Sequence, residues 1–193
     1  MSKIIVLASS SPRRQEILRN LGVNFEIARS NYKEILDHAK SPYELASYTA
    51  LQKCKSIPKT YKTNNIVVGA DTIVVYKGVL EKPADPQEAF QMLKTLSNNV
   101  HEVVTGIGIM DYGRGIYVSD YEVTRVYFRK LNNKEIHKYI STGEPMDKAG
   151  AYGIQGKASL FIKRIEGDYF NVVGLPVYKL GLMLKKYFNY SIL

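Results

Sequence analysis

The sequence predicts an α/β domain built on a mixed β-sheet. Three observations lead to this prediction: apolar β-branched runs, stretches that begin with helix-start residues, and one strong hairpin signal. Strand-like and helix-like segments follow one another along the chain without a repeat or a linker. We therefore expect residues 1–193 to form a single α/β domain.

The first third of the chain predicts a strand, a loop and a helix, followed by a second short strand and a second helix. The opening run is β-branched and does not alternate, which is typical of a buried strand. Ser11 suits the N-cap of the next helix, and Pro12 suits its first position. The expected elements are a strand at 3–8, a helix from Pro12 to Gly22, a strand at 25–28 and a helix at 42–57.

The rest of the chain continues this mixture of strands and helices. The segment Asp85-Pro86-Gln87-Glu88 has the cap, proline and acid of a helix start. The segment Asp111–Gly115 is the clearest hairpin turn in the sequence. The expected elements are strands at 66–76, 100–110, 116–128 and 158–165, helices from Asp85 onward, at 132–141 and at 176–187, and loops at 142–156 and 166–174.

Composition excludes several classes of protein. Of 193 residues, 45% are hydrophobic and 23% are charged, which argues against disorder and fibrous repeats. The single cysteine, Cys54, cannot form an internal disulfide and is expected to be a core residue. With no secretory signal at residues 1–10, this predicts a cytoplasmic protein. The apolar runs are far shorter than the ~20 residues that cross a bilayer, so we expect no membrane segment.

The net charge of +9 suggests an anionic partner. Nucleic acid, an acidic membrane surface and a phosphorylated metabolite all fit this charge. The excess of Lys and Arg is spread over both halves of the chain, without the basic tail of a dedicated nucleic-acid arm. A soluble protein that is simply basic remains the alternative.

The segment from Ser9 to Arg14 has the chemistry of an anion site. Arg13 and Arg14 fall in the first turn of the expected helix, where the helix dipole favours anions over cations. Free backbone N–H groups, serine hydroxyls and two guanidinium groups would together bind a polyphosphate. The alternative is that both arginines are only solvated.

The segment Gly69-Ala70-Asp71-Thr72 places a carboxylate inside an apolar strand. A buried carboxylate is costly unless a cation or a metal lies beside it. Asp71 is therefore a candidate metal ligand or general base, and Gly69 would allow a ligand to approach closely. A structural aspartate is the alternative.

Two weaker patterns follow. Pro83 favours an extended Lys82, which could direct its ammonium group toward a site, although a surface lysine is the simpler interpretation. In the glycine-rich segment 147–156, Gln155 could read a base edge through its amide, and Tyr152 could stack on a base or pack in the core.

Other catalytic motifs are missing from the sequence. Ala151 breaks the spacing that a Walker A loop requires. His38, His101 and His137 lie too far apart for a recognisable zinc motif, and no G-x-S-x-G segment supports a serine hydrolase.

Taken together, the polar motifs resemble the Maf family of septum-formation-inhibitor-like nucleoside triphosphate pyrophosphatases. The matching segments are residues 7–14, Gly69–Thr72, Glu81–Pro83, 147–156 and Gly174–Pro176. The resemblance implies a fold like that of the inosine triphosphate pyrophosphatases (Maf/Ham1), with a long mixed sheet flanked by helices and a deep cleft between two lobes. It also implies hydrolysis between the α and β phosphates with a divalent cation, Mg²⁺ or Mn²⁺.

The resemblance also assigns residues. Asp71 matches the proton acceptor, and Glu34 matches an acid that helps to hold metal or water, so both are expected metal ligands. Lys53 and Lys82 match two catalytic lysines. The expected substrate-binding residues are Ser9, Arg13, Arg14, Thr72 and Gln155, of which Arg13, Thr72 and Gln155 match positions tied to substrate choice.

The ending Gly153-Ile154-Gln155-Gly156 resembles the branch of the family that acts on dTTP and UTP. A Glu-Gly ending would mark the branch that acts on methylated guanosine triphosphate. The family name also records a link to cell division, and a house-cleaning role toward modified pyrimidine nucleotides is a further expectation.

A different class of function is a regulator of division that binds nucleic acid or a protein partner, with hydrolysis secondary. The polar motifs match a catalytic set rather than a basic, aromatic-studded surface, so we do not expect a nucleic-acid partner. The sequence leaves a homodimer open.

Overall fold

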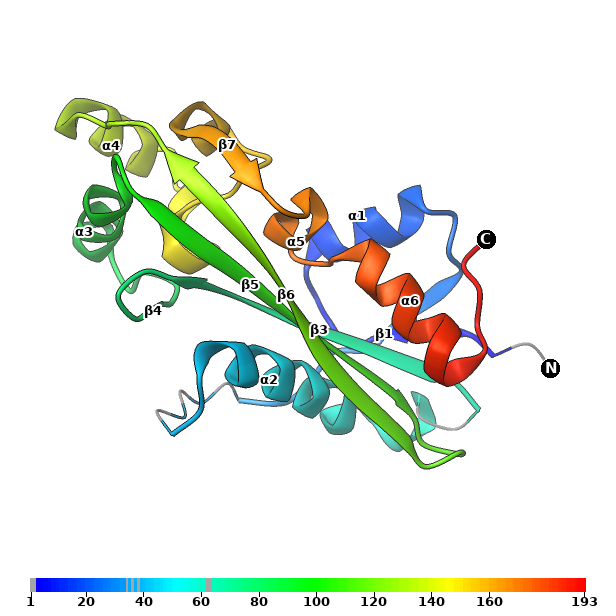
Figure 1. The fold of residues 1–193 in the computed structure, drawn as a ribbon. Helices are drawn as coiled ribbons and strands as arrows, with labels where there is room; N and C mark the ends of the chain where they lie inside the picture. Colours follow the sequence, from blue (N-terminus) through cyan, green and yellow to red (C-terminus); the bar gives the residue numbers. More distant parts are fainter. Residues whose placement is uncertain (1–2, 34, 36, 38, 62–63) are drawn as a thin grey trace. The chain divides into compact units, whose positions relative to one another are not determined.

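The computed structural model describes residues 3–33, 35, 37, 39–61 and 64–193. Seven strands form one mixed sheet in the order β2-β1-β3-β5-β6-β7, with β4 paired to β3 (Figure 1). Helices lie against the sheet, so the predicted α/β class with a long mixed sheet is confirmed.

The strands are β1 (Ile5–Leu7), β2 (Phe25–Ile27), β3 (Ile66–Val75), β4 (Val79–Leu80), β5 (Val100–Asp111), β6 (Ile116–Phe128) and β7 (Ile162–Glu166). The α-helices are α1 (Pro12–Asn20), α2 (Pro42–Ser56), α3 (Pro86–Leu96), α4 (Asn133–Ile140), α5 (Tyr169–Val173) and α6 (Val177–Phe188). The 3₁₀ helices are η1 (Lys59–Tyr61), η2 (Glu144–Asp147), η3 (Ala149–Ala151) and η4 (Lys157–Phe161).

The chain divides into two compact units. Unit 1 comprises residues 1–71, 105–122 and 174–193, and unit 2 comprises residues 72–104 and 123–173. The expectation that residues 1–193 act as one domain stays a prediction.

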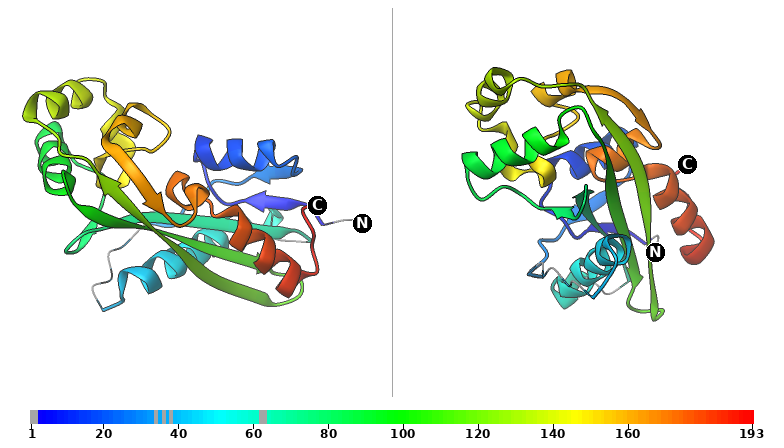
Figure 2. Two further views of the ribbon diagram at one scale, coloured as in Figure 1. Left: turned by 45° about the horizontal axis from the view of Figure 1, so that its top comes forward. Right: turned by 60° about the vertical axis from the view of Figure 1, so that its left-hand side comes forward.

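In unit 1, β1 lies between β2 and β3 and is parallel to both. Its residues Ile5–Leu7 are fully buried, which explains why the sequence here is apolar without alternation. Helices α1 and α2 lie on opposite faces of the sheet, with α6 on the α1 side (Figure 1, Figure 2). Helix α2 begins with a capping box, in which Ser41 and Glu44 each bond the other's backbone N–H.

Glycines let α2 approach the strands closely. A Cβ at Gly106 would lie 2.1 Å from the carbonyl oxygen of Ala46, and one at Gly108 would lie 2.5 Å from the Cα of Leu51. Contacts this short do not occur between real atoms, so no larger residue fits while α2 keeps its place.

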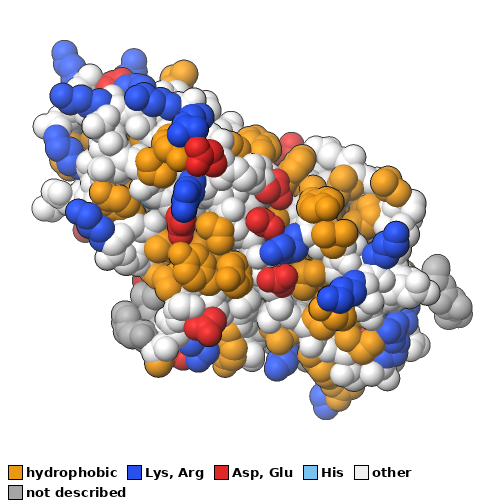
Figure 3. Space-filling model, viewed as in Figure 1, with side chains coloured by type: hydrophobic (Ala, Val, Ile, Leu, Met, Phe, Trp, Pro, Cys, Tyr) orange, Lys and Arg blue, Asp and Glu red, His pale blue; other side chains and the backbone are white. Residues whose placement is uncertain are grey.

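Unit 2 has its own apolar core, between the sheet, α3, α4 and the 3₁₀ helices η2, η3 and η4. The rings of Phe128 and Tyr152 pack edge to face, with centroids 4.8 Å apart. Strand β7 is antiparallel to β6, with a bulge at Tyr127 and Phe128. Lys134 and Lys138 of α4 are exposed. Basic side chains are scattered over the face shown in Figure 3 rather than gathered in one patch.

Two predictions near the C-terminal end of unit 2 were wrong. The expected strand at 158–165 begins as the 3₁₀ helix η4, because Ala158 and Phe161 are both buried and a 3₁₀ helix puts such an i, i+3 pair on one side. The expected loop at 166–174 contains α5, whose first turn is stabilised by a 2.8 Å bond from the Phe170 N–H to Asp168.

His101 is a buried histidine whose protonation should weaken the fold. It is 2% exposed, and its Nε2 lies 2.6 Å from the Tyr152 hydroxyl. Its Nδ1 is buried and has no hydrogen-bond partner in the described ranges of the chain. Because burial penalises the charged ring, the pKa of His101 is lowered from 6.5 to about 4.

We expect the free energy of unfolding to fall as the pH drops from about 6.5 to about 4. In this range His101 binds a proton in the unfolded chain and stays neutral in the folded chain. The shift corresponds to a loss of about 3 kcal/mol across this window. Urea unfolding at several pH values should show that His101→Gln, which cannot titrate, reduces this dependence. An identical pH dependence in the variant would contradict the expectation.

Candidate functional site

The N-terminal end of α1 carries a network centred on Ser9, which is 7% exposed. Its Oγ accepts bonds from the Ser11 N–H at 3.2 Å and from Arg14 Nη1 at 3.3 Å. Arg14 Nε donates to the Gly174 carbonyl at 2.8 Å. The network thus joins the end of β1, the first turn of α1 and the segment before α6.

Ser11 occupies the predicted N-cap position, but its side chain makes no capping bond. Backbone N–H groups at the start of a helix that lack a capping side chain can bind an anion. The first turn of α1 holds no acidic residue, and Arg13 is half-buried without a hydrogen-bond partner among the residues that the structure describes. Backbone donors and Arg13 are therefore available to an anion at this end of the helix.

Asp71 lies in β3 and is 8% exposed, as the sequence predicted for a buried carboxylate. Its Oδ1 is 2.6 Å from Nζ of Lys53, which comes from the last turn of α2, and each side chain is 11% exposed. The cation needed to offset the burial of Asp71 is therefore Lys53. Two residues that are far apart in the sequence, both expected to be catalytic, form one buried ion pair.

We expected Gly69 to allow a ligand to approach closely, and this prediction was wrong. A Cβ at Gly69 would lie 2.5 Å from the Ala50 carbonyl oxygen and 2.8 Å from the Cys54 sulfur. Gly69 therefore makes room for α2 rather than for a ligand. Cys54 is fully buried, with its sulfur 3.2 Å from the Gly108 carbonyl oxygen, which confirms it as a core residue.

Three further candidates, Thr72, Lys82 and Gln155, lie in unit 2. Thr72 follows Asp71 directly and is half-buried. Lys82 is exposed, and its loop is held to the glycine-rich segment by a 3.0 Å bond from the Gly150 N–H to the Glu81 carbonyl. The two weakest sequence patterns are thus hydrogen-bonded neighbours.

Gln155 and Tyr152 have different surroundings. Gln155 is exposed in the turn between η3 and η4, and its amide has no hydrogen-bond partner within the described segments. Tyr152 is 6% exposed and packs against His101 and Phe128, so it is a core residue and not a base-stacking one. Burial raises the pKa of Tyr152 well above its ordinary value.

Sequence reasoning missed Glu144, at the start of η2. Its Oε1 accepts a 3.0 Å bond from the Tyr139 hydroxyl, and its Oε2 accepts a 3.1 Å bond from the Lys157 N–H. Burial, and secondly the charge of Glu144, raise the pKa of Tyr139 well above its ordinary value. The only local signal for this residue is an acid placed just before Pro145 in a glycine-rich stretch.

Glu34, the second expected metal ligand, lies outside the described residues. Among the residues that are described, no group of three or more His, Cys, Asp or Glu side chains is arranged to hold a metal ion. Across that same part of the chain, no helix has the length and hydrophobicity of a membrane span.

The fold and these side chains define an α/β protein with a buried Lys–Asp pair and, in the same unit, a helix end whose backbone donors lack a capping side chain. The family model described as "Maf-like protein" matches residues 4–187. The chain therefore belongs to the Maf family.

Curated relatives match over nearly their whole length. A "dTTP/UTP pyrophosphatase" of Alkaliphilus oremlandii (strain OhILAs) is 52% identical over 191 residues, covering 99% of this chain and 100% of the relative. Proteins of the same description from Thermoanaerobacter sp. (strain X514) and Clostridioides difficile (strain 630) are 51% and 43% identical, covering 98% and 97% of this chain and 99% and 97% of their own.

Among solved structures, a nucleoside-triphosphatase described as a dITP/XTP pyrophosphatase of Mycobacterium abscessus matches with a TM-score of 0.43 and 16% identity. The match covers 66% of this chain and 75% of that one, and a likeness this weak supports no conclusion about function.

Proposed function

We propose that this protein hydrolyses dTTP and UTP to the nucleoside monophosphate and pyrophosphate. The observation that carries the proposal is the buried Lys53–Asp71 pair, located in the same unit as the N-terminal end of α1. The names of relatives that are 43–52% identical over almost the whole chain support the choice of substrate.

Binding of the triphosphate is assigned to the end of α1. The helix N-terminus offers backbone N–H groups and a positive dipole, and Arg13 and Arg14 add guanidinium donors that suit phosphate oxygens. Ser9 and Gly174 hold the Arg14 side chain, so its orientation is set before substrate binds. Charge neutralisation of this kind is the main requirement of phosphoryl-transfer chemistry.

Activation of water is assigned to Asp71. Lys53 contacts its Oδ1, and the carboxylate can accept a proton from a water molecule or orient that water toward a phosphorus atom. The attack adds the water oxygen to the α phosphorus and releases pyrophosphate, and the water proton passes to the Asp71 carboxylate.

A divalent cation fits this donor set. Mg²⁺ is commonly held by one or two carboxylates together with substrate phosphates. One protein carboxylate, that of Asp71, is therefore enough when the substrate supplies phosphate oxygens. Asp71, with Glu34 as the second expected ligand, would hold Mg²⁺ or Mn²⁺. When bound, the metal would neutralise phosphate charge.

Base selection is assigned to unit 2. The exposed Gln155 amide can donate to a carbonyl of uracil or thymine and accept from its N3–H. Thr72 and Arg13 are the other residues expected to influence substrate choice, and Lys82 is expected to be catalytic. The methylated-guanosine branch, binding of nucleic acid, a homodimer and a cytoplasmic location are not part of this proposal, and each stays a prediction or an alternative.

Purified protein with Mg²⁺ or Mn²⁺ should release pyrophosphate from dTTP and UTP faster than from other nucleoside triphosphates. Product analysis by anion-exchange chromatography distinguishes the bond that is cleaved. Release of single phosphate would contradict the proposal. Retardation of labelled nucleic acid across a salt series, without turnover, would support the regulator alternative.

Gln155→Glu should weaken turnover of dTTP and UTP selectively. An ionised carboxylate has no donor, so one polar group of the base is left unpaired, at a cost of about 1–3 kcal/mol or roughly a ten- to hundredfold loss in kcat/KM. The measurement compares kcat/KM for dTTP, UTP, CTP and GTP in the wild type and the variant. An equal loss for all four nucleotides would mean that Gln155 supports the loop and does not read the base.

A further inference from the structure

Glu144 of η2 connects two other parts of unit 2, α4 and η4. Its carboxylate accepts one bond from a side chain, Tyr139 of α4, and one from a backbone group, the Lys157 N–H of η4. Tyr139 is 4% exposed and packs against Phe161, so the phenol offers a fixed support. One oxygen of the carboxylate is therefore fixed by the buried Tyr139. The other oxygen binds the backbone of Lys157, two positions after Gln155.

The turn that carries Gln155 also packs directly on this carboxylate. A Cβ at Gly156 would lie 2.0 Å from Glu144 Oε1 and 2.8 Å from Oε2, so there is no room for any side chain at Gly156 while Glu144 stays in place. The turn is closed by a 3.2 Å bond from the Gly156 N–H to the Gly153 carbonyl. The packing of Gly156 on Glu144 and its hydrogen bond to Gly153 thus fix the backbone next to Gln155.

We propose that Glu144 is a positioning residue for base selection, acting through Gln155. This inference rests on the proposed function, in which the Gln155 amide pairs with a pyrimidine. An exposed side chain can read a base with two hydrogen bonds when its backbone is already ordered, because less conformational entropy is then lost on binding. Glu144 orders the turn through its contacts with Gly156 and Lys157, and it does not itself contact the base.

Removing the carboxylate should raise KM and leave kcat nearly unchanged. In Glu144→Ala, the KM for dTTP and UTP should rise about tenfold, the scale of one disturbed hydrogen bond to a base, with kcat within about twofold of wild type. The bond from Lys148 Nζ to the Glu144 backbone carbonyl survives this substitution, so that part of η2 keeps its support. A fall in kcat with no change in KM would overturn the proposal.

The chain offers a matched control in Glu135 of α4. Its carboxylate also bonds one side chain, Arg129 Nη2 at 2.6 Å, and one backbone group, the Asn132 N–H at 3.0 Å. Glu135→Ala likewise removes one side-chain bond, here an ion pair with Arg129, and one backbone bond from the same unit, but none from the Gln155 turn. It should lose thermal stability comparably and keep the wild-type KM, whereas an equal rise of KM in both variants would refute a specific role for Glu144.

Two further variants test whether Glu144 acts through Gln155. Adding Glu144→Ala to Gln155→Ala should change the dTTP/CTP preference no further, because the contact that it positions is already lost. Glu144→Gln should restore most of the preference, since its amide oxygen can accept from Lys157 and its NH₂ can donate to the Tyr139 oxygen. Additive losses in the double variant would show that Glu144 acts by another route.

Amide hydrogen exchange decides the positioning role independently of turnover. The Lys157 amide should exchange at least tenfold faster in Glu144→Ala than in the wild type or in Glu135→Ala, because its acceptor is gone. Unchanged exchange would overturn the inference. If the wild type shows no preference for dTTP and UTP, the proposed function fails, while the exchange result still shows whether Glu144 orders the turn.

Discussion

Replacing Asp71 with Asn is expected to lower kcat by about 10² or more, the usual scale for losing a general base. The amide has nearly the shape of the carboxylate, and its oxygen can still accept the bond from Lys53 that now measures 2.6 Å. The folded structure should therefore persist, although the loss of the ion pair lowers its stability. Steady-state release of pyrophosphate, measured beside a thermal melt, separates the two effects.

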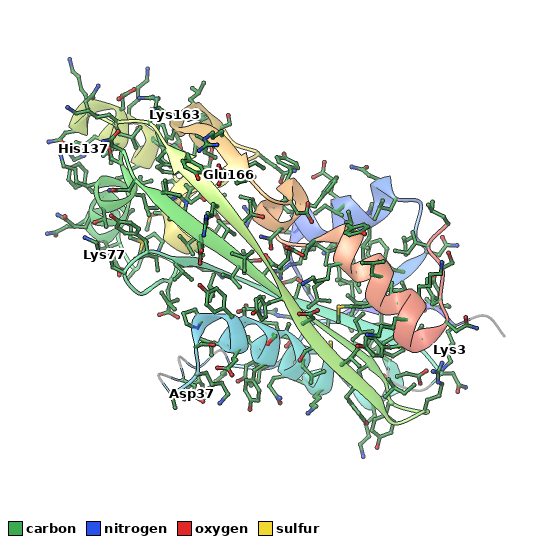
Figure 4. All side chains as sticks on the ribbon, viewed as in Figure 1. Lys3, Asp37, Lys77, His137, Lys163 and Glu166 are labelled. Atoms are coloured by element: carbon green, nitrogen blue, oxygen red, sulfur yellow. The ribbon has the colours of Figure 1, made fainter. Side chains whose placement is uncertain are left out.

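Asp111 provides the control for this variant. It is a second buried aspartate of unit 1, with no exposed surface, and forms ion pairs with Lys3, labelled in Figure 4, and with Arg114. Asp111→Asn should lower the melting temperature without a comparable fall in kcat, because neither Lys3 nor Arg114 belongs to the candidate site. Wild-type turnover by Asp71→Asn in a normally melting protein would make Asp71 a structural residue as well.

Gly106→Ala is expected to destabilise the protein by about 3 kcal/mol or more. The added methyl group would lie 2.1 Å from the Ala46 carbonyl oxygen and 2.5 Å from the Ser47 backbone nitrogen. These are main-chain atoms of α2, so the overlap can be relieved only by moving the helix away from β5. Urea denaturation at neutral pH measures the change in the free energy of unfolding.

Gly181→Ala on α6 is the comparison, since a Cβ at that position has no neighbour within 4 Å. Alanine in the interior of a helix is favoured over glycine by roughly 0.5–1 kcal/mol, so this variant should be slightly more stable than the wild type. Near-wild-type stability of Gly106→Ala would mean that α2 packs less tightly on β5 than its backbone position indicates.

Elements whose sequence contains its own start and stop signals were predicted well. The hairpin after Asp111 and helix α3, capped by Asp85, are determined by local turn and capping chemistry. By contrast, η4 and α5 are too short for a periodic signal and depend on distant partners. Asn171 of α5, for example, donates to the Val103 carbonyl and to Thr124 Oγ1, both at 2.9 Å.

The candidate site was predictable only in part. Asp71 could be identified from the sequence because a carboxylate in an apolar strand needs a partner, but the identity of that partner could not. Lys53 sits in an ordinary helix and was assigned by family resemblance alone, whereas the structure gives it a physical reason in the 2.6 Å ion pair. Glu144 was missed because its partners are a phenol and a backbone N–H, neither of which leaves a pattern in the sequence.

The interleaving of the two units has a consequence for synthesis of the protein. Unit 2 is complete once Val173 has been made, whereas unit 1 still needs residues 174–193, although it begins at the N-terminus. The hydrogen bond from Arg14 to Gly174 joins residues 160 positions apart and can form only at that late stage. Domains commonly fold from the N-terminal end as they leave the ribosome, and contacts between distant residues slow folding. We therefore expect the N-terminal end of α1, the proposed phosphate-binding site, to be synthesised among the first residues and to become ordered among the last.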